Sequence, residues 1–267
     1  MHLVRLALLA GSFLAAPALA QEIAKAPPRI ADNSFLIEEA YNQEAGVVQH
    51  IGAFRRAPGG AWLFTFTQEW PAPSQRHQLS YTVPLLSERG AGMGVGDLAI
   101  NYRYQAVGRD DEPVWFSPRV SVLVPTGSTQ YRRGVGGPGV QVNLPVSFYV
   151  TPLLVTHWNL GATVTRSRSF SGSRGTPTSF NAGASAIFLA TPNLNLMVEG
   201  LYERSETLTD LGLMFTEKRY TVVPGVRGAF NFASGMQVVP GIGFPISGSN
   251  SGDRDVFLYL SVEHSFK

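Results

Sequence analysis

From residue 46 onward, apolar and polar residues alternate in short runs, which clusters of Gly, Pro, Ser and Asn separate. The run at 140–150 is the clearest, because every second residue from Val140 to Val150 is apolar and most residues between them are polar. This period of two is typical of a β-strand with one apolar face. Twelve strands are predicted, at 46–56, 61–70, 76–85, 95–106, 114–125, 140–150, 154–166, 178–190, 193–203, 218–232, 236–245 and 253–267.

The length of these runs separates two kinds of β protein. Strands of soluble proteins usually span about five or six residues, whereas a tilted strand needs about 9–11 residues to cross a bilayer. The predicted runs are of the longer kind, which favours strands that span a membrane. The final run has Val256, Leu258, Leu260 and Val262 on one face and ends near Phe266. It is predicted to be the closing strand of a barrel, and an edge strand of a soluble sandwich is the alternative.

The connections between the runs alternate in length, as in barrels with short periplasmic turns and longer outer loops. Short turns are predicted at 151–152, 191–192 and 233–235, and longer loops at 126–137, 167–177, 205–217 and 246–252. The alternation is weaker in the first half of the chain, so ten or fourteen strands also fit the pattern. The predicted fold is all-β, a single antiparallel, up-and-down transmembrane β-barrel of twelve strands over residues 46–267.

Composition supports an exported β protein. Residues 1–20 combine Arg5, an apolar run and an Ala-Leu-Ala sequence, which is typical of a cleaved signal peptide. The 28 Gly and 18 Pro residues suit many strands and turns, and the absence of Cys excludes disulfides and thiol-bound metals. The formal net charge is +2 and falls by one when Arg5 is lost with the leader. This near-neutral balance gives no indication of a nucleic-acid partner.

The two faces of the strands can be assigned from the cost of placing charge in lipid. A charged residue at the bilayer midplane costs about 2–4 kcal/mol, so the apolar faces are expected to meet lipid and the polar faces to line the lumen. The residues expected in the lumen are Glu69, Asp97, Arg103, Arg119, His157, Asn159, Glu199, Arg227 and Glu263. Because these residues carry both signs of charge, the sequence predicts a polar, hydrated interior.

Residues 21–45 lack the alternation and are predicted to form a separate N-terminal segment in the periplasm or the lumen. Asn33 or Ser34 is a candidate cap for a short helix that ends at Gly46, and an irregular course is the alternative. The segment is rich in acidic residues and has no basic residue after Arg29. It is therefore predicted to plug the lumen through carboxylate–guanidinium pairs, with a periplasmic leader of no fixed place as the alternative.

The residues assigned to this plug are of two kinds. The segment contributes a gate of Glu38, Glu39 and Glu44, together with Tyr41. The barrel contributes a seat of Arg103, Arg119 and Arg227 and the further lumenal residues Asp97, His157 and Asn159.

Several stretches of the sequence resemble one family of proteins. The most specific is D-N-S-F-L-I-E-E-A-Y-N-Q-E at 32–44, followed by G-V-V-Q-H-I at 46–51. Shorter matches are Gly96-Asp97, N-Y-R-Y at 101–104, Pro118-Arg119, P-T-G at 125–127, and His157 with N-L-G at 159–161. Over nearly the whole chain after residue 20, these stretches resemble the transporter-like outer-membrane barrels named for the meta-cleavage pathway of phenol degradation. The resemblance implies a Gram-negative outer-membrane barrel with a transporter-like role, and it implies neither a substrate nor site residues.

The predicted function is the passage of small solutes, apolar or aromatic ones included, through a porin-like barrel in the bacterial outer membrane. The acidic segment is expected to close the lumen in part. The expected partners are outer-membrane lipid, lipopolysaccharide and the small-molecule solute, and no cofactor is expected.

Two other classes of function are weighed against transport. A barrel enzyme that acts on lipid is one alternative, because His157 and Asn159 share a strand face and suit a catalytic His with an orienting amide. No G-x-S-x-G motif supplies a serine, so no catalytic residue is predicted and the protein is not expected to be an enzyme. A structural or adhesive barrel is the other alternative. No metal site is predicted, because His50, His77, His157 and His264 fall on different strands.

Overall fold

The structure is a computed structural model that describes residues 30, 34–56, 58–88, 92–109, 112–247 and 255–266. The predicted signal peptide at 1–20 lies outside the described residues, as does most of 21–33. No helix in the described ranges is long and apolar enough to cross a membrane.

The described chain consists of β-strands, one short 3-10 turn, η2 (Pro58–Gly60), and irregular connections. The strands are β1 (Val47–Arg56), β2 (Trp62–Pro71), β3 (His77–Glu88), β4 (Gly92–Val95), β5 (Leu98–Tyr104), β6 (Val114–Phe116), β7 (Arg119–Val124), β8 (Gly139–Asn143), β9 (Val146–Thr151), β10 (Leu154–Thr165), β11 (Ser167–Arg168), β12 (Arg174–Gly175), β13 (Thr178–Thr191), β14 (Leu194–Leu208), β15 (Met214–Gly228), β16 (Phe230–Asn231), β17 (Gln237–Gly243), β18 (Ile246–Ser247) and β19 (Val256–Ser265).

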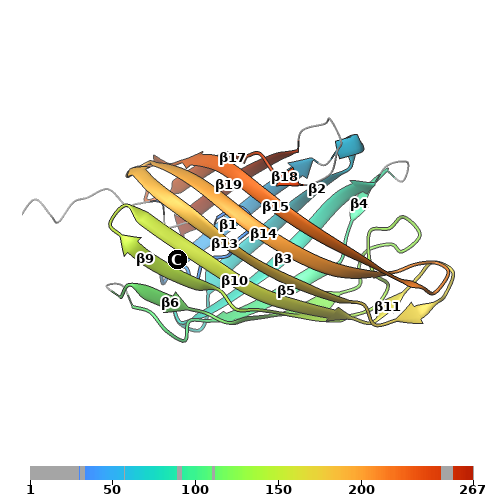
Figure 1. The fold of residues 1–267 in the computed structure, drawn as a ribbon. Coiled ribbons are helices and arrows are strands. Elements are labelled where there is room, and N and C mark those ends of the chain that lie inside the picture. Colours follow the sequence, from blue (N-terminus) through green and yellow to red (C-terminus); the bar gives the residue numbers. More distant parts are fainter. Residues whose placement is uncertain are drawn as a thin grey trace, which may run out of the picture.

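The strands form a closed antiparallel barrel (Figure 1). β1 pairs with β2 on one side and with β19 on the other, from Val47 opposite Ser265 to Arg56 opposite Val256. β4 with β5, β6 with β7, β8 with β9, β15 with β16 and β17 with β18 are halves of interrupted strands, and β11 and β12 form a small hairpin outside the wall. In the described residues the wall therefore has twelve strands, which confirms the predicted fold and strand number.

Proline explains several of the interruptions. Pro118 separates β6 from β7, Pro145 separates β8 from β9, and Pro245 separates β17 from β18. A proline has no N–H group to donate to a neighbouring strand, which weakens the ladder at these points, although Pro84, Pro224 and Pro240 lie within β3, β15 and β17 without ending them. The breaks between β6 and β7 and between β8 and β9 lie side by side, because the Ser117 N–H group donates to the Pro145 carbonyl at 3.2 Å.

The two faces of the wall differ as predicted. On β10, Trp158 and Leu160 are 54% and 47% exposed on the outer face, whereas His157 and Asn159 between them are buried on the inner face. The same alternation holds along β19, where Leu258 is exposed and its neighbour Phe257 is buried. An apolar band of this kind suits lipid on the outside of the barrel.

The interior is not uniformly polar, and here the sequence prediction is wrong in part. A buried apolar cluster lies inside the wall and includes residues of β10, β13, β14, β15, β17 and β19; its members are Ile30, Phe35, Ile51, Val155, Ile187, Leu189, Met197, Val223, Ala229, Val239, Phe257 and Tyr259. Ile30 and Phe35 belong to the N-terminal segment. The inner wall is apolar in this region because it packs against that segment instead of water.

The hairpin of β14 and β15 is longer than the sequence predicted. A loop was expected at 205–217, but pairing continues from Ser205 opposite Glu217 to Leu208 opposite Met214. Figure 1 shows the tip of this hairpin beside β11 at one end of the barrel. Residues 214–220 are exposed on both faces of the strand. Neither face therefore has to be apolar, so apolar and polar residues do not alternate here and the sequence does not reveal the strand.

Candidate functional site

Residues 34–46 lie inside the barrel and follow an irregular course without a helix. The helical alternative was therefore wrong, and the irregular alternative describes the segment. Phe35, Ile37 and Ala40 are buried, and the Ser34 hydroxyl donates to the Ser185 hydroxyl of β13 at 2.9 Å. Ile30 and Tyr41 line the same small cavity, so the chain turns back on itself within the lumen.

Side chains of the wall satisfy the backbone of the segment. A buried N–H group needs a partner, and in a helix these groups would bond to carbonyls of the segment itself. Here they donate to side chains of several strands: Phe35 and Leu36 to Glu199, Glu38 to Asn159, Ala40 to Ser147, Asn42 to Gln105, and Gln43 to Gln78. These external acceptors explain why a sequence with helix-start signals forms no helix.

Two glutamates of the segment meet two arginines of the wall. Arg103 of β5 lies 3.3 Å from Glu38 and 3.2 Å from Glu39, while Arg119 of β7 lies 3.0 Å from Glu38. Arg103 also donates to the Tyr41 carbonyl at 2.8 Å, and the Asn143 amide donates to Glu38 at 2.6 Å. Charged hydrogen bonds in a site with little water are stronger than those in bulk solvent. The contact therefore holds the middle of the segment against β5 and β7.

The surroundings of Glu38 favour its charged form. Burial on its own raises the pKa of the Glu38 carboxyl, but Arg119, Arg103 and the Asn143 amide outweigh burial and lower the pKa from its ordinary value of 4.5. Glu38 belongs to the segment in the lumen and not to a membrane-spanning strand.

The remaining residues of the predicted gate and seat lie elsewhere. Glu44 is exposed where the segment leaves the lumen, and in the described structure it forms no ion pair. Arg227 lines the small cavity with Ile30 and Tyr41. Asp97 accepts hydrogen bonds from the N–H groups of Gly127 at 2.9 Å and Val135 at 2.8 Å. It therefore fixes the loop between β7 and β8, and within the described residues no hydrogen bond or ion pair joins it to the segment.

Glycines of the wall make room for the two buried apolar side chains of the segment. A Cβ atom added to Gly241 would lie 2.7 Å from the Phe35 ring, and one added to Gly243 would lie 2.9 Å from it. A Cβ atom added to Gly225 would lie closer still to the same ring, and one added to Gly183 would collide with Ile37. Because a larger residue would collide with these side chains, the wall on β13, β15 and β17 is shaped to receive the segment.

Tyr41 packs against aromatic side chains of β6, β9 and β10. Its ring centroid lies 5.7 Å from that of Trp115, 5.8 Å from that of His157 and 6.4 Å from that of Tyr149. Because these contacts are edge-on or offset, they add packing energy to the apolar burial. Tyr41 therefore fixes the returning part of the segment.

His157 does not form the catalytic arrangement that was considered. Asn159 bonds to the backbone of Glu38 through both its oxygen and its nitrogen, at 2.8 Å each. A serine does stand beside His157, because Ser147 Oγ lies 2.7 Å from His157 Nδ1. Both residues are fully buried, however, and Ser147 Oγ also accepts the Ala40 N–H group. A lipid substrate outside the barrel has no access to this pair.

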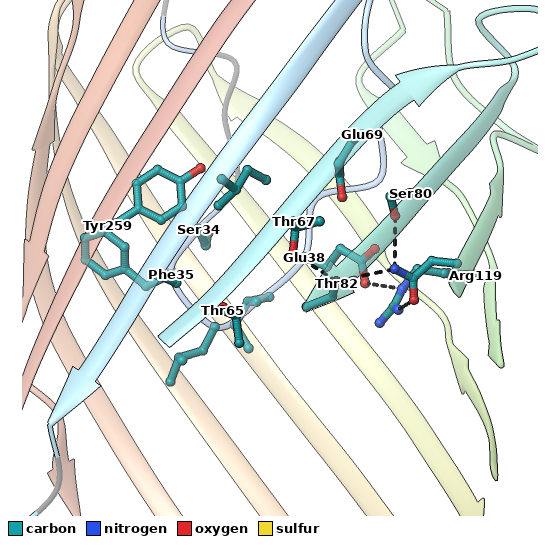
Figure 2. Close-up of a pocket in the computed structure, with 15 residues that line it drawn as sticks. Ser34, Phe35, Glu38, Thr65, Thr67, Glu69, Ser80, Thr82, Arg119 and Tyr259 are labelled. Carbon is teal, nitrogen blue, oxygen red and sulfur yellow. Dashed lines mark hydrogen bonds and ion pairs between the residues drawn. The ribbon is translucent and has the colours of Figure 1, made fainter. Parts of the chain in front are cut away.

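A cavity of about 350 Å³ remains beside the segment (Figure 2). It lies between residues 34–38 and the wall formed by β1, β2, β3, β5, β7 and β19. Figure 2 shows Phe35 and Tyr259 on one side and Arg119 on the other, with Glu38, Thr65, Thr67 and Thr82 between them. The lumen is therefore narrowed by the segment and not filled by it.

Sequence reasoning missed part of this site. Glu199 was expected in the lumen, but its bonds to the Phe35 and Leu36 N–H groups were not foreseen. Gly225, Gly241 and Gly243 gave no signal other than glycine within a strand, which indicates a close approach of another group. In the described residues no group of three or more His, Cys, Asp or Glu could hold a metal ion.

Comparison with known proteins identifies the fold. No family model and no curated protein match the sequence. Among solved structures, an outer-membrane channel from Pseudomonas putida F1 is similar with a TM-score of 0.60 and 14% identity, over 85% of this chain and 98% of that chain. The NanC porin is similar with a TM-score of 0.52 and 8% identity, over 82% of this chain and 99% of that chain. The chain thus has the fold of outer-membrane channels and porins.

Proposed function

We propose that this protein is an outer-membrane channel through which small solutes pass beside a fixed N-terminal segment. The observation that carries the proposal is the cavity of about 350 Å³ between the segment and the wall of a closed barrel. Its volume lies within the range of about 300–1,000 Å³ that is usual for small-molecule sites. The fold shared with known channels and porins supports the same function.

The lining of the cavity indicates which solutes suit it. Phe35, Ile51 and Tyr259 offer apolar surface, and the hydroxyls of Thr65 and Thr82 offer hydrogen bonds. The charges of Glu38 and Arg119 at its edge neutralise each other at 3.0 Å. Small neutral solutes with an apolar or aromatic part are therefore the proposed cargo.

The location follows from the outer face of the barrel. Its exposed apolar residues require lipid, and we assign them to the bacterial outer membrane, which the protein would reach through a cleaved signal peptide. Arg132 and Arg133 lie in the loop between β7 and β8, where they are candidates for contact with lipopolysaccharide phosphates.

Conductance in a planar bilayer tests the proposal. Residues 21–267 are refolded and compared with a version that lacks residues 22–45. A larger and steadier conductance in the shortened protein is expected, because the segment narrows the lumen. Equal conductance in both would remove the gating role of the segment while keeping the channel. Silence in both, from protein with the gel mobility of a folded barrel, would contradict a channel.

Liposome swelling then tests the choice of solute. Glucose and gluconate are similar in size and differ in charge, so their rates of entry compare neutral with anionic cargo. We expect faster entry of glucose through the intact protein. Equal rates would show that the lining does not select against charge.

A further inference from the structure

The closing seam of the barrel brings together two histidines that are 214 positions apart in the chain. His50 lies on β1 and His264 lies on β19, close to the end of each strand. Their Nε2 atoms are 3.3 Å apart, and their rings stack with centroids 5.4 Å apart. Both side chains are partly exposed on the outer face, since the neighbours Gln49 and Glu263 bond to each other at 2.8 Å on the inner face.

A backbone carbonyl sets the proton position on one of the two rings. His264 Nδ1 lies 3.0 Å from the Ser265 carbonyl oxygen. Because a carbonyl can only accept a hydrogen bond, this nitrogen carries the proton, and Nε2 of the neutral ring is an acceptor within hydrogen-bond distance of His50 Nε2. Metal-binding histidines typically have this arrangement, with the distal ring nitrogen donating to a carbonyl or carboxylate.

The spacing of the two nitrogens fits a tetrahedral metal ion. Zinc–nitrogen bonds of about 2.0–2.1 Å at a tetrahedral angle place two ligand nitrogens about 3.4 Å apart. The measured separation of 3.3 Å between His50 and His264 matches this distance without movement of either strand. We propose that these two residues form a two-histidine site for a divalent transition-metal ion, Zn²⁺ above all, with water completing the coordination.

The consequence of such a site is a link between the first and the last strand of the wall. The two nitrogens meet only when β1 pairs with β19, so the ion binds the closed barrel and not the unfolded chain. Binding of this kind raises stability in proportion to the logarithm of metal concentration. No sequence pattern indicates the site, because two single histidines at opposite ends of a chain become neighbours only through closure of the barrel.

Calorimetric titration of the folded protein with Zn²⁺ tests the proposal. The protein is purified without a histidine tag and held in detergent micelles, and His50→Gln and His264→Gln are compared with the wild type. His77→Gln is the matched control, because His77 is also partly exposed and contacts Tyr102 instead of another histidine. We expect one Zn²⁺ per chain in the wild type and in His77→Gln. In His50→Gln and in His264→Gln we expect the affinity for Zn²⁺ to fall by about 10-fold or more.

Thermal unfolding supplies a second readout. Added Zn²⁺ is expected to raise the unfolding midpoint of the wild type and of His77→Gln, and to leave the two seam variants unchanged. Equal Zn²⁺ affinity in all four proteins, or no stoichiometric binding by the folded wild type, would overturn the proposal. If the seam variants fail to fold, electron paramagnetic resonance of one equivalent of Cu²⁺ on the wild type decides the matter. Coupling to two imidazole nitrogens supports the site, and its absence contradicts it.

Discussion

Glu38 joins the segment to the wall through more than one charged contact. Its carboxylate lies 3.3 Å from Arg103 and 3.0 Å from Arg119, and it accepts a hydrogen bond from the Asn143 amide at 2.6 Å. Glu38 keeps part of its side chain exposed to the cavity, so its contacts are weaker than those of a fully buried pair. Loss of its charge would nevertheless leave two guanidinium groups without their shared partner.

Substitution of Glu38 by Gln is therefore expected to loosen the segment. The docked state should lose about 1.5–3 kcal/mol, which is the usual contribution of hydrogen bonds to charged groups. In single-channel recordings this loss appears as more frequent openings to the conductance of the shortened protein. Glu44→Gln is the matched control, because Glu44 is exposed and forms no ion pair in the described structure. The same change in both variants would show that overall charge, and not the contact, is responsible.

The lowered pKa of Glu38 predicts an effect of pH on the same recordings. Because the docked Glu38 carboxyl has a pKa below 4.5, this group binds fewer protons in the docked segment than in the released one. Its stability is therefore complete above the released pKa and is lost as pH falls through the docked pKa. We expect the Glu38 contact to weaken, and conductance to rise, as pH falls below 4.5. Glu38→Gln should lack this acid response, and a response that persists in the variant would assign it to another group.

The N-terminal segment depends on a particular shape of its surrounding strands. Gly225 of β15 and Gly241 and Gly243 of β17 form a shallow surface under the Phe35 ring. This surface is backbone and cannot move aside, unlike a flexible side chain. The wall strands thus determine both the position of the segment and the width of the cavity that it leaves.

Substitution of Gly241 by Ala is expected to displace Phe35. The new methyl group would lie 2.7 Å from the ring, closer than van der Waals contact, and such overpacking costs about 1–3 kcal/mol. The cost should appear as easier proteolysis of the segment while the barrel keeps its folded gel mobility. Gly200→Ala on β14 is the control, because nothing lies within 4 Å of its added Cβ atom. In a Phe35→Ala background the Gly241 substitution should have no further effect, and an undiminished effect there would contradict the contact.

The alternation of apolar and polar residues was sufficient to predict the strands. It predicted fewer of the contacts between the N-terminal segment and the wall. Trp158 and Leu160 outside and His157 inside follow directly from a period of two. The segment was predicted as a helix or an irregular plug because capping and breaking residues describe only local preferences, and the acceptors that decided its course, such as Glu199, are more than 160 positions away.

Asp97 illustrates the same limit at another position. Its place on the inner face was predicted from the alternation, but its partners are the N–H groups of Gly127 and Val135 in a loop. The alternation predicts on which side of the wall a residue lies. It does not predict how far along the barrel axis the residue lies or which residues it contacts. Arg103 and Arg119 reach the glutamates of the segment, whereas Arg227, predicted by the same rule, lies beside Ile30 and Tyr41.

At the scale of the whole molecule, the wall separates an apolar exterior from an interior that is partly polar and partly filled by its own chain. The closing pair of β1 and β19 places Leu258 and Leu260 on the outside and Tyr259 and Ser261 on the inside. In a soluble sandwich these exposed leucines would be unfavourable, because they would contact water instead of lipid.

Leu260→Lys tests which solvent meets the outer face. In lipid vesicles the substitution should lower the free energy of unfolding by about 2–4 kcal/mol, because it places a charge near the middle of the bilayer. Phe266→Lys, just past the end of β19, should cost only about 0–1 kcal/mol, as expected close to the interface. Denaturant titration of folded protein in vesicles gives both values. A Leu260→Lys variant as stable as the wild type would show that this face is hydrated.

The contacts that hold residues 34–46 also impose an order on assembly. Their partners are spread along the chain from Gln49 to Tyr259, so the segment is synthesised before any of the strands that receive it. Its binding surface is complete only after β17 has joined β15 and β19. The full set of contacts can therefore form only in the closed wall, so docking of the segment is completed no earlier than closure of the barrel.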